Sequence, residues 1–593
     1  MNKFLVFLAL GFLAIACKKE KEVKDEVLLP PIDKVFESYY QKKLVLNPLQ
    51  ATFSGDNRYN DQLAIDISQE FKTKEWVLNM RYKDTLDMYD SSGLTEEEQL
   101  SRDILKWEIE QSLKLLEFEA ELIPVNQLFS LPLTIGQLGS GSGAQPFKTA
   151  KDYDNWLARL DRFTVWCDTA VANMRRGIKK GYVLPKSLIK KVIPQLESLT
   201  AGEVEKNIFF TPVTNMPESL TEREKKQIRE SYTAALELKV LPKLNTLLEF
   251  IKTDYMEAGR TSSGVDELPN GEALYKQLIE YFTTTTMTAD EIHELGLREV
   301  DRITREMEKV KEEVGFTGSL KEFFEEVRTK KELMPFKKPE QVLEHFHEIH
   351  ERIKPNLEKL FDMTPKTAFE IRRTEAFREA SASAQYNPGS LDGSRPGIFY
   401  VPIPDATAYN IYSDEDLFLH EAIPGHHYQV SLQQENESLP EFRKTLWYSA
   451  YGEGWALYTE SLGKELGLYK DPYQYFGMLS AEMHRAIRLV VDTGLHAKGW
   501  TREQAIEYSL DHEAESKAGI ISEVERYMAI PGQALSYKIG QIKIQELRAR
   551  AEKELGASFD IRQFHNEVLR YGCLPLKLLE EKVNTWISTQ KNS

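Results

Sequence analysis

The sequence predicts a mainly α-helical fold, and three observations on its 593 residues support that prediction. Charged and apolar residues recur at helical spacing through most of the chain, and strict strand-like alternation is rare. A helix start is clearly signalled where Thr288 and Glu291 form a capping box, after which Ile292, Leu295 and Ile303 recur on one face. Segments rich in Gly, Ser, Pro and Asn, such as "SGDNRYND" and "YNPGSLDGSRPG", separate the helical stretches as loops.

Length and charge bound the organisation of the chain. With 41% hydrophobic residues the chain is long enough for a large core and more than one part, and we expect an N-terminal helical region over 31–270 and a second region over 271–593. A net charge of -17 and a pI near 5.4 exclude nucleic acid as a partner, because phosphate binding needs an excess of clustered Lys and Arg.

The N-terminus has the anatomy of a secretory signal. An apolar run over residues 4–16 is too short to span a bilayer, and the "LAIAC" that ends at Cys17 resembles a bacterial lipobox with Ala14 in place of the usual leucine. We expect a lipoprotein signal over 1–17, lipidation of Cys17 and a charged tether over 18–30; a plain secretory signal is the alternative. Either way the protein is expected outside the cytoplasm, in the periplasm or at the cell surface. The remaining cysteines, Cys167 and Cys573, do not predict a disulfide framework.

One strand is predicted, at "GIFYVPI" over residues 397–403, where β-branched and aromatic residues follow a turn. Pro402 and Pro404 cannot donate to a ladder, so we expect an edge strand. Such an edge can pair with an extended peptide, or the strand can simply pack.

Just downstream, "HEAIPGHHYQ" over 420–429 departs from the zinc-binding pattern H-E-x-x-H, because Pro424 stands where the second histidine would be. Ser413 is a candidate N-cap, so His420 and Glu421 should lie inside a helix. In an unbroken helix His427 would lie about 10.5 Å beyond His420, too far to share one ion. If Pro424 and Gly425 form a two-residue bulge, the next histidine returns to the place of the second ligand.

A third ligand is suggested by "YGEGWALYTE" over 451–460, which resembles the N-E-G-F-A-x-Y-x-E stretch of aminopeptidase-N-like metallopeptidases. The resemblance implies that Glu453 binds the metal, while Gly452 replaces the usual asparagine. Glu460 lies two turns further on the same face, as an outer carboxylate. Two histidines and one carboxylate leave a fourth position for water, which is the arrangement of a catalytic Zn²⁺ site. Glu421 would be the general base.

Over about 300 positions the chain resembles the domain-of-unknown-function 885 family, which comprises bacterial proteins, many of them lipoproteins, grouped with zincin peptidases. The matching pieces include "HEAIPGHHYQ", "GEGWALYTE", "DTGLHAKGWTREQAIEY" and "RYMAIPGQALSYKIGQIKIQELR". Weaker similarity extends to the thimet oligopeptidase, carboxypeptidase Taq and angiotensin-converting enzyme families, where H-E-x-G-H places glycine before the second ligand. Gly425 and His426 stand in that order, which favours His426 over His427. The resemblance implies a zincin-like fold: two helical halves around a cleft, with a small sheet beside the helix of the site, and short peptides as substrates.

Further candidates follow the glutamate motif, each with packing as its alternative role. Asp492 and His496 lie one turn apart on a predicted helix, the former as an outer carboxylate and the latter touching substrate or metal. Related peptidases use a tyrosine from the later helical half to donate a hydrogen bond to the developing oxyanion, and Tyr527 and Tyr537 are candidates for that role. Four residues are expected to face the substrate: His427, Arg395, Arg526 and Lys538. The two arginines and the lysine could bind a carboxylate of the peptide.

Three functions fit these residues: a membrane-tethered zinc peptidase with one ion, a non-catalytic lipoprotein that binds peptides or a partner on the same scaffold, and a hydrolase of another amide. The helix interruption favours the second function if it separates the ligands. The sequence assigns neither the cleavage end nor the oligomeric state.

Overall fold

The computed structural model describes residues 29–141, 143–375, 379, 382–391, 393 and 395–592. Cys17, the predicted signal segment and all of the predicted tether before residue 29 lie outside these residues. Within the described part, no helix combines the length and the apolar character that crossing a membrane requires. The predicted mainly helical fold is confirmed, and a single small sheet interrupts the helices among the described residues.

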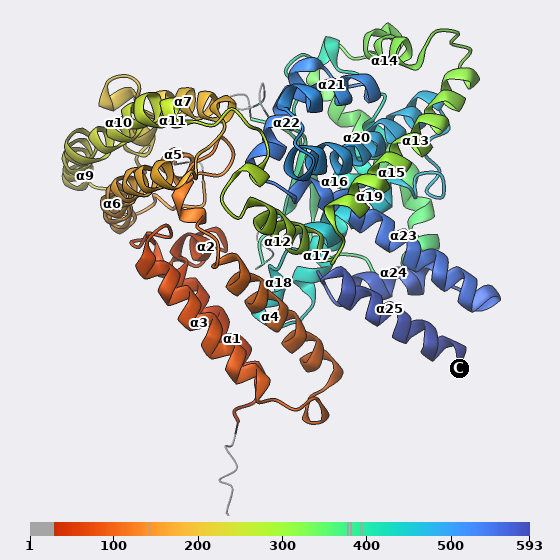
Figure 1. The fold of residues 1–593 in the computed structure, drawn as a ribbon, viewed down its shortest axis with the longest axis horizontal. Helices are drawn as coiled ribbons and strands as arrows, with labels where there is room; N and C mark the ends of the chain where they lie inside the picture. Colours follow the sequence, from red (N-terminus) through yellow and green to blue (C-terminus); the bar gives the residue numbers. More distant parts are fainter. Residues whose placement is uncertain are drawn as a thin grey trace, which may run out of the picture.

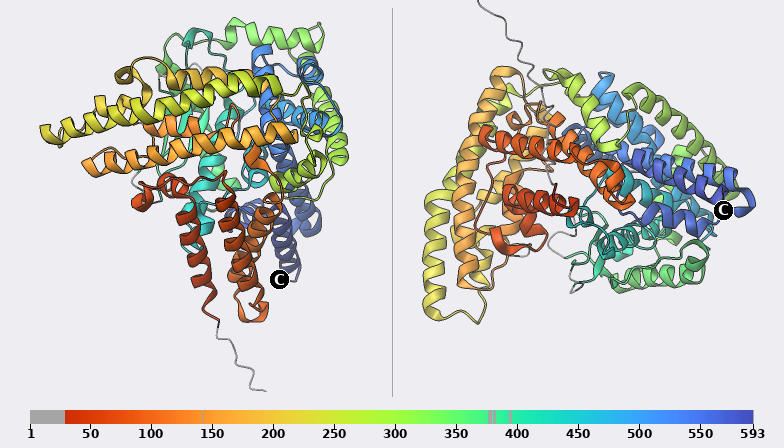
Figure 2. Two further views of the ribbon diagram at one scale, coloured as in Figure 1. Left: turned by 60° about the vertical axis from the view of Figure 1, so that its left-hand side comes forward. Right: turned by 90° about the horizontal axis from the view of Figure 1, so that it is seen from below.

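The first region is helical throughout (Figure 1). The long helices α6, α9 and α10 extend outward from the rest of the molecule (Figure 2). Two π-helical stretches, at Leu236–Val240 and Ile251–Tyr255, join α9, α10 and α11 into one continuous helical run. The helices are α1 (Ile32–Leu46), α2 (Pro48–Phe53), α3 (Gln69–Asp87), α4 (Glu96–Leu115), α5 (Leu131–Gly139), α6 (Ala150–Lys180), α7 (Lys186–Thr200), α8 (Thr211–Thr214), α9 (Glu222–Ala235), α10 (Leu241–Phe250) and α11 (Met256–Ala258).

The second region carries the sheet and the remaining helices. Its first helix, α12, packs against α4 of the first region as well as against α19, α20 and α23. The elements are α12 (Gly271–Thr283), α13 (Ala289–Glu313), α14 (Leu320–Thr329), α15 (Pro339–Leu360), β1 (Phe369–Arg373), β2 (Gln385–Asn387), β3 (Gly397–Val401), α16 (Asp414–Glu421), α17 (His426–Glu435), α18 (Glu441–Lys444), α19 (Ser449–Glu460), α20 (Pro472–Ala497), α21 (Arg502–His512), α22 (Lys517–Ala529), α23 (Ser536–Leu555), α24 (Ile561–Leu569) and α25 (Leu576–Lys591).

A buried arginine ties the two regions together. Arg443 of α18 donates to Glu97 and to Ser101 of α4, and also to the backbone oxygen of Tyr571. Its side chain is 1% exposed, so these bonds replace the water that a guanidinium would otherwise require.

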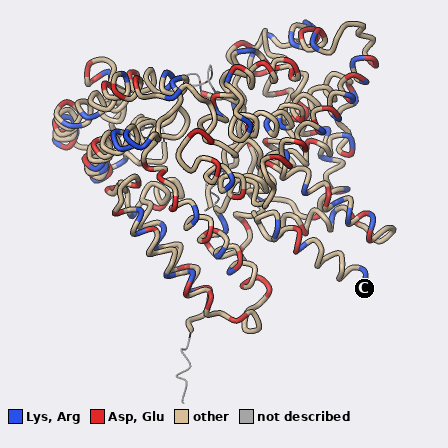
Figure 3. The backbone as a smooth tube through the Cα atoms, in the orientation of Figure 1, with Lys and Arg blue, Asp and Glu red and all other residues tan. Residues whose placement is uncertain are grey.

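Elsewhere Lys and Arg alternate with Asp and Glu along the helices, and the net negative charge is spread over the chain (Figure 3).

Helix starts follow the local sequence in most places. The predicted capping box of Thr288 and Glu291 is present at the start of α13. Ser413 does precede the first residue of α16, but its side chain accepts no capping hydrogen bond, which corrects the predicted cap. The backbone N–H of Glu415 instead donates to the side-chain oxygen of Gln474, from a distant helix, at 3.2 Å. A tertiary contact therefore replaces the local cap.

The predicted strand forms over Gly397–Val401, but it is the central strand of the sheet, which has the order β1-β3-β2. β1 pairs with β3 in parallel and β2 pairs with it antiparallel. The expectation of an edge strand was wrong because Pro402 and Pro404 lie beyond the paired residues and remove no ladder bond. The edge strand next to α17 is β2.

A close helix contact in the second region joins α19 to α23. A Cβ atom on Gly540 would lie 1.8 Å from the backbone oxygen of Ala450, and one on Gly454 would lie 2.5 Å from the backbone carbon of Gly540. Glycine at both positions allows the two backbones to touch. The position of α19, which carries Glu453 and Glu460, is thereby set against α23.

We predict that Gly540→Ala destabilises the protein by about 1–3 kcal/mol, because the new methyl group must push the backbones of α19 and α23 apart. Urea unfolding followed by circular dichroism measures the change. Gly93→Ala is the matched control, since a Cβ atom there meets nothing within 4 Å, and it should change stability by less than about 0.5 kcal/mol. Equal stability of the two variants would contradict the assigned role of this contact.

Candidate metal centre

The helix that begins at Asp414 ends at Glu421, and a new helix begins at His426. The predicted two-residue bulge is therefore a full break over residues 422–425. Gly425 fits against the end of α16 so closely that a Cβ atom would lie 1.9 Å from the backbone oxygen of His420. The indole N–H of Trp455 donates to the backbone oxygen of Pro424 at 2.9 Å. The break is thus held from both sides by packing and by a buried hydrogen bond.

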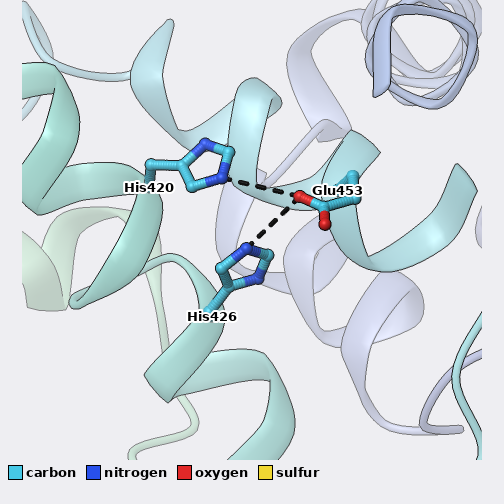
Figure 4. Close-up of side chains that lie close together, drawn as sticks. All are labelled: His420, His426 and Glu453. Carbon is cyan, nitrogen blue, oxygen red and sulfur yellow. Dashed lines mark ion pairs between the residues drawn. The ribbon is translucent and has the colours of Figure 1, made fainter. Parts of the chain in front are cut away.

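This break brings His420 and His426 together, with ring centroids 4.8 Å apart (Figure 4). The Nε2 atoms of His420 and His426 lie 3.5 Å and 3.4 Å from the same oxygen of Glu453. Zinc ligands bound tetrahedrally at 2.0–2.1 Å lie about 3.3 Å from one another. The three side chains that the sequence singled out as ligands therefore converge, and the two nitrogen-to-oxygen distances suit ligands of one small divalent ion.

Glu460 orients the first histidine. Its Oε1 atom lies 2.7 Å from Nδ1 of His420, on the side of the ring away from Glu453. A carboxylate in this place holds the ring in position and selects the tautomer whose other nitrogen faces a metal. The predicted role of Glu460 as an outer carboxylate agrees with this geometry. Thr459 adds a hydrogen bond from its hydroxyl to the backbone oxygen of Leu419 at 2.9 Å, which fixes α19 to α16.

The charges of the histidines and the glutamates at the centre support one another. Burial by itself lowers the pKa of His420, but the hydrogen bonds and charges of Glu453 and Glu460 outweigh burial and raise that pKa to about 10. Burial acts to raise the pKa of Glu453, and the two imidazoles hold it well below its usual range. A proton on His420 thus supplies positive charge where these carboxylates require it.

Glu421 and His427 have different surroundings. Glu421 faces the cavity described below, and its Oε2 atom accepts a hydrogen bond from the backbone N–H of Tyr386 at 2.7 Å. His427 is 2% exposed and points away, with Nδ1 3.0 Å from the Tyr386 hydroxyl. Its ring packs on Phe369, and burial lowers the pKa of His427 to about 4. The expectation that His427 faces substrate is corrected, and His426 is the histidine beside Glu453.

A cavity of about 1680 Å³ opens onto His420, Glu421, His426 and Glu453. Its lining comes from both regions, including Pro48 to Gly55 near α2 and residues of α20, α22 and α23. Three further predicted residues line it: Arg395, Arg526 and Tyr537. The cavity therefore places the candidate metal centre between the two regions.

Other candidates lie elsewhere because their polar atoms are used within the protein. Lys538 is fully buried, with ion pairs to Glu482 at 2.6 Å and Glu299 at 3.0 Å, so it cannot receive a substrate carboxylate. Asp492 accepts from the Tyr275 hydroxyl and from a backbone N–H at 2.6 Å and 3.0 Å. Asp492 and His496 do share α20, on the same side of the helix as Arg485, but neither residue lines the cavity.

His496 and Tyr527 are buried against each other's segments. His496 accepts from the backbone N–H of Val265 at 3.1 Å, and its other ring nitrogen lies 3.0 Å from the backbone oxygen of Tyr527. The hydroxyl of Tyr527 donates to Glu523 at 3.0 Å, and its side chain is 2% exposed. The expectation that either residue contacts substrate is corrected, and of the two predicted tyrosines Tyr537 is the one that lines the cavity.

Two features of the site were missed at the level of sequence. The Trp447 ring lies 5.7 Å from that of His426, and a Cβ atom on Gly452 would lie 2.1 Å from it, so Trp447 fills the space of a side chain at that position. Arg485 and Arg488 also line the cavity. The signal for the arginines was their place in "HRAIRLVV", where charges interrupt an apolar helix.

Comparisons with known proteins agree with this fold. Residues 48–583 match the family model described as "Bacterial protein of unknown function (DUF885)", and no curated protein matches the chain. A crystal structure described as that of a "putative lipoprotein from Colwellia psychrerythraea" is 27% identical, with a TM-score of 0.87 over 94% of this chain and 99% of that one. A structure described as that of "a putative lipoprotein of unknown function from Shewanella oneidensis" is 19% identical, with a TM-score of 0.75 over 93% and 99% of the two chains, and it supports the fold alone. The chain belongs to the family of bacterial proteins of unknown function DUF885.

Proposed function

We propose that this protein is a zinc-dependent peptidase that acts outside the cytoplasm, anchored by a lipid on Cys17. The observation that carries the proposal is the convergence of His420, His426 and Glu453 at one wall of a large cavity, with Glu421 beside them. One ligand atom from each of the three side chains lies within 4.8 Å of the others. Two imidazole nitrogens and a carboxylate oxygen are the donor set of catalytic zinc sites, which keep a further position open.

A bound zinc ion would supply Lewis acidity, which lowers the pKa of a water molecule and polarises a carbonyl. The chain contributes the remaining steps. Glu460 holds the ring of His420 in its orientation, and Glu421 accepts the proton of the attacking water and returns it to the leaving amine. Tyr537 reaches the cavity with a hydroxyl that can donate to the developing oxyanion.

The size and lining of the cavity support a peptide as the substrate. A cavity of about 1680 Å³ exceeds the 300–1,000 Å³ typical of small-molecule pockets, and it runs between the two regions. An extended peptide fits such a space better than a compact amide does. The helix interruption, which would favour a non-catalytic binding protein if it dispersed the ligands, instead accompanies their convergence. Catalysis is therefore the function we propose.

The anchor is proposed from the "LAIAC" segment that ends at Cys17 and from the similar chains of Colwellia psychrerythraea and Shewanella oneidensis, each described as a "putative lipoprotein". A lipid there would hold the cavity near a membrane surface through the short charged segment that precedes α1.

We predict that the metal-free protein binds one zinc ion and releases about one proton at pH 8, because His420 must lose its proton to become a ligand. Affinity should fall as pH falls, since the pKa of His420 is raised to about 10 in the metal-free protein. Calorimetry in two buffers of different ionisation enthalpy measures the proton count. His426→Ala should lose binding, whereas His347→Ala, at an exposed histidine, should retain it. Absence of zinc uptake at micromolar zinc would refute the metal site.

Glu460→Gln should weaken zinc binding about 10- to 100-fold, because an amide is a poorer acceptor for the N–H of a metal-bound imidazole. A competition titration with a chelating dye measures the affinity. Glu437→Gln, at an exposed glutamate, serves as the control. Unchanged affinity with normal folding would show that Glu460 does not orient the ligand.

Glu421→Gln should keep zinc and lose at least about 100-fold in turnover, because the amide cannot accept the proton of the attacking water. The backbone N–H of Tyr386 can still donate to the amide oxygen, so the local fold should persist. Zinc content by atomic absorption and hydrolysis of a pool of short peptides give the two readouts. Full activity in this variant would overturn the mechanism.

A further inference from the structure

One wall of the cavity carries arginine side chains from two helices. Arg485 and Arg488 come from α20, and Arg526 comes from α22. All three line the same cavity as Glu421 and Glu453. The candidate metal centre and this arginine wall therefore face the same cavity.

Arg488 is the most constrained of the three. Its side chain is 6% exposed, Nη2 donates to Glu523 at 2.8 Å and Nε donates to the Tyr527 hydroxyl at 3.3 Å. The guanidinium lies over the ring of Tyr537, with 4.5 Å from its central carbon to the ring centroid. Nη1 is buried and has no hydrogen-bond partner among the described residues. A buried guanidinium nitrogen without an acceptor is costly, so the site is complete only when an acceptor is supplied.

The positive charge of this wall exceeds its negative charge. Glu523 is shared by Arg488 and by Arg526, which lies at 3.5 Å. Burial acts to raise the pKa of Glu523, but Arg488 and His484 outweigh it and hold that pKa well below its usual range. His484 is itself paired with Glu513 at 2.5 Å. Two further carboxylates lie near the wall: Glu515, which is exposed to solvent, and Asp416, which shares a second cavity with Arg485.

Arg485 and Arg526 can adjust to a ligand. Nε of Arg485 is buried without a partner in the described part of the chain. Arg526 is 25% exposed, and its Nη2 atom donates to Gln533 at 2.8 Å and to the Tyr537 hydroxyl at 3.3 Å. Tyr537 thus contacts two of the three arginines: its ring lies under the guanidinium of Arg488, and its hydroxyl accepts a hydrogen bond from Arg526.

The wall also adjoins the helix of the metal centre. Arg485 lines a second cavity of about 140 Å³ together with Asp416, His420 and Glu460. α20 packs directly on α16, which carries His420 and Glu421. A peptide bound to this wall through an anionic group would therefore have its neighbouring peptide bonds in the space that Glu421 faces.

We propose that Arg488, Arg526 and Arg485 bind a carboxylate of the substrate, and that the enzyme consequently removes residues from the carboxyl end of short peptides. This proposal rests on the proposed peptidase function. The carboxylate that the wall recognises has two sources, the C-terminus of the peptide or an acidic side chain near it. A planar guanidinium fork suits either carboxylate, through paired charge-assisted hydrogen bonds.

The test compares trialanine with trialanine amide. Binding to zinc-loaded Glu421→Gln is measured by calorimetry, and hydrolysis is measured with the native protein. The free carboxylate should improve affinity about 10- to 100-fold over the amide, and Arg526→Gln should abolish that difference. The amide of alanyl-alanyl-glutamate provides the second arm: affinity equal to that of free trialanine would assign the wall to an acidic side chain.

Lys444→Gln is the matched control, because Lys444 also lines the cavity but is paired with Glu441 at 2.6 Å, and the preference for the free carboxylate should persist in that variant. Arg488→Lys keeps the charge and removes the fork, so it should lower the preference while the protein still folds. The proposal would be overturned if zinc-loaded Glu421→Gln, with no further substitution, bound trialanine, its amide and the glutamate amide equally. Because binding is measured without turnover, a protein that binds the free carboxylate but hydrolyses nothing refutes the peptidase function alone.

Discussion

The break in the helix between Glu421 and His426 is the constraint on which the candidate centre depends. In a continuous helix the side chain of residue 426 would lie about 120° around the axis and about 9 Å along it from His420. The break replaces that separation with rings whose centroids are 4.8 Å apart. It persists because Gly425 leaves no side chain between itself and the end of α16, and because Trp455 donates to the oxygen of Pro424.

A single helix, α19, supplies most of the partners of that break. Glu453 faces both histidines, Trp455 and Thr459 bond the backbone around the break, and Glu460 bonds the far side of the ring of His420. Packing against α23 sets the position of α19, because glycine at positions 454 and 540 lets the two backbones come into contact. The candidate metal centre is therefore positioned by helix packing more than by the loop that contains the motif.

The cavity joins this centre to groups of opposite character. Carboxylates and imidazoles stand at one side, and the wall of α20 and α22 presents guanidinium groups whose charge exceeds that of Glu523. A substrate with an anionic end and an amide bond nearby matches both. Residues of the first region line part of the cavity, and the buried Arg443 holds that region to the second one. The two regions thus contribute to one space, which is where we propose that a peptide binds.

The helical class and the capping box at Thr288 could be predicted because periodicity and capping act over a few residues along the chain, and His420, Glu421, His426 and Glu453 could be singled out because their segments resemble zinc-binding motifs. The order of the sheet, the replacement of the Ser413 cap by Gln474, the inward burial of Asp492, His496 and Lys538, and the arginine wall could not. Each of these depends on which distant partner satisfies a strand edge, a backbone N–H or a buried charge. Local sequence determined which groups the chain offers for chemistry, and only tertiary packing decided which of them face a common cavity, because a buried polar group goes to whichever partner the fold places beside it.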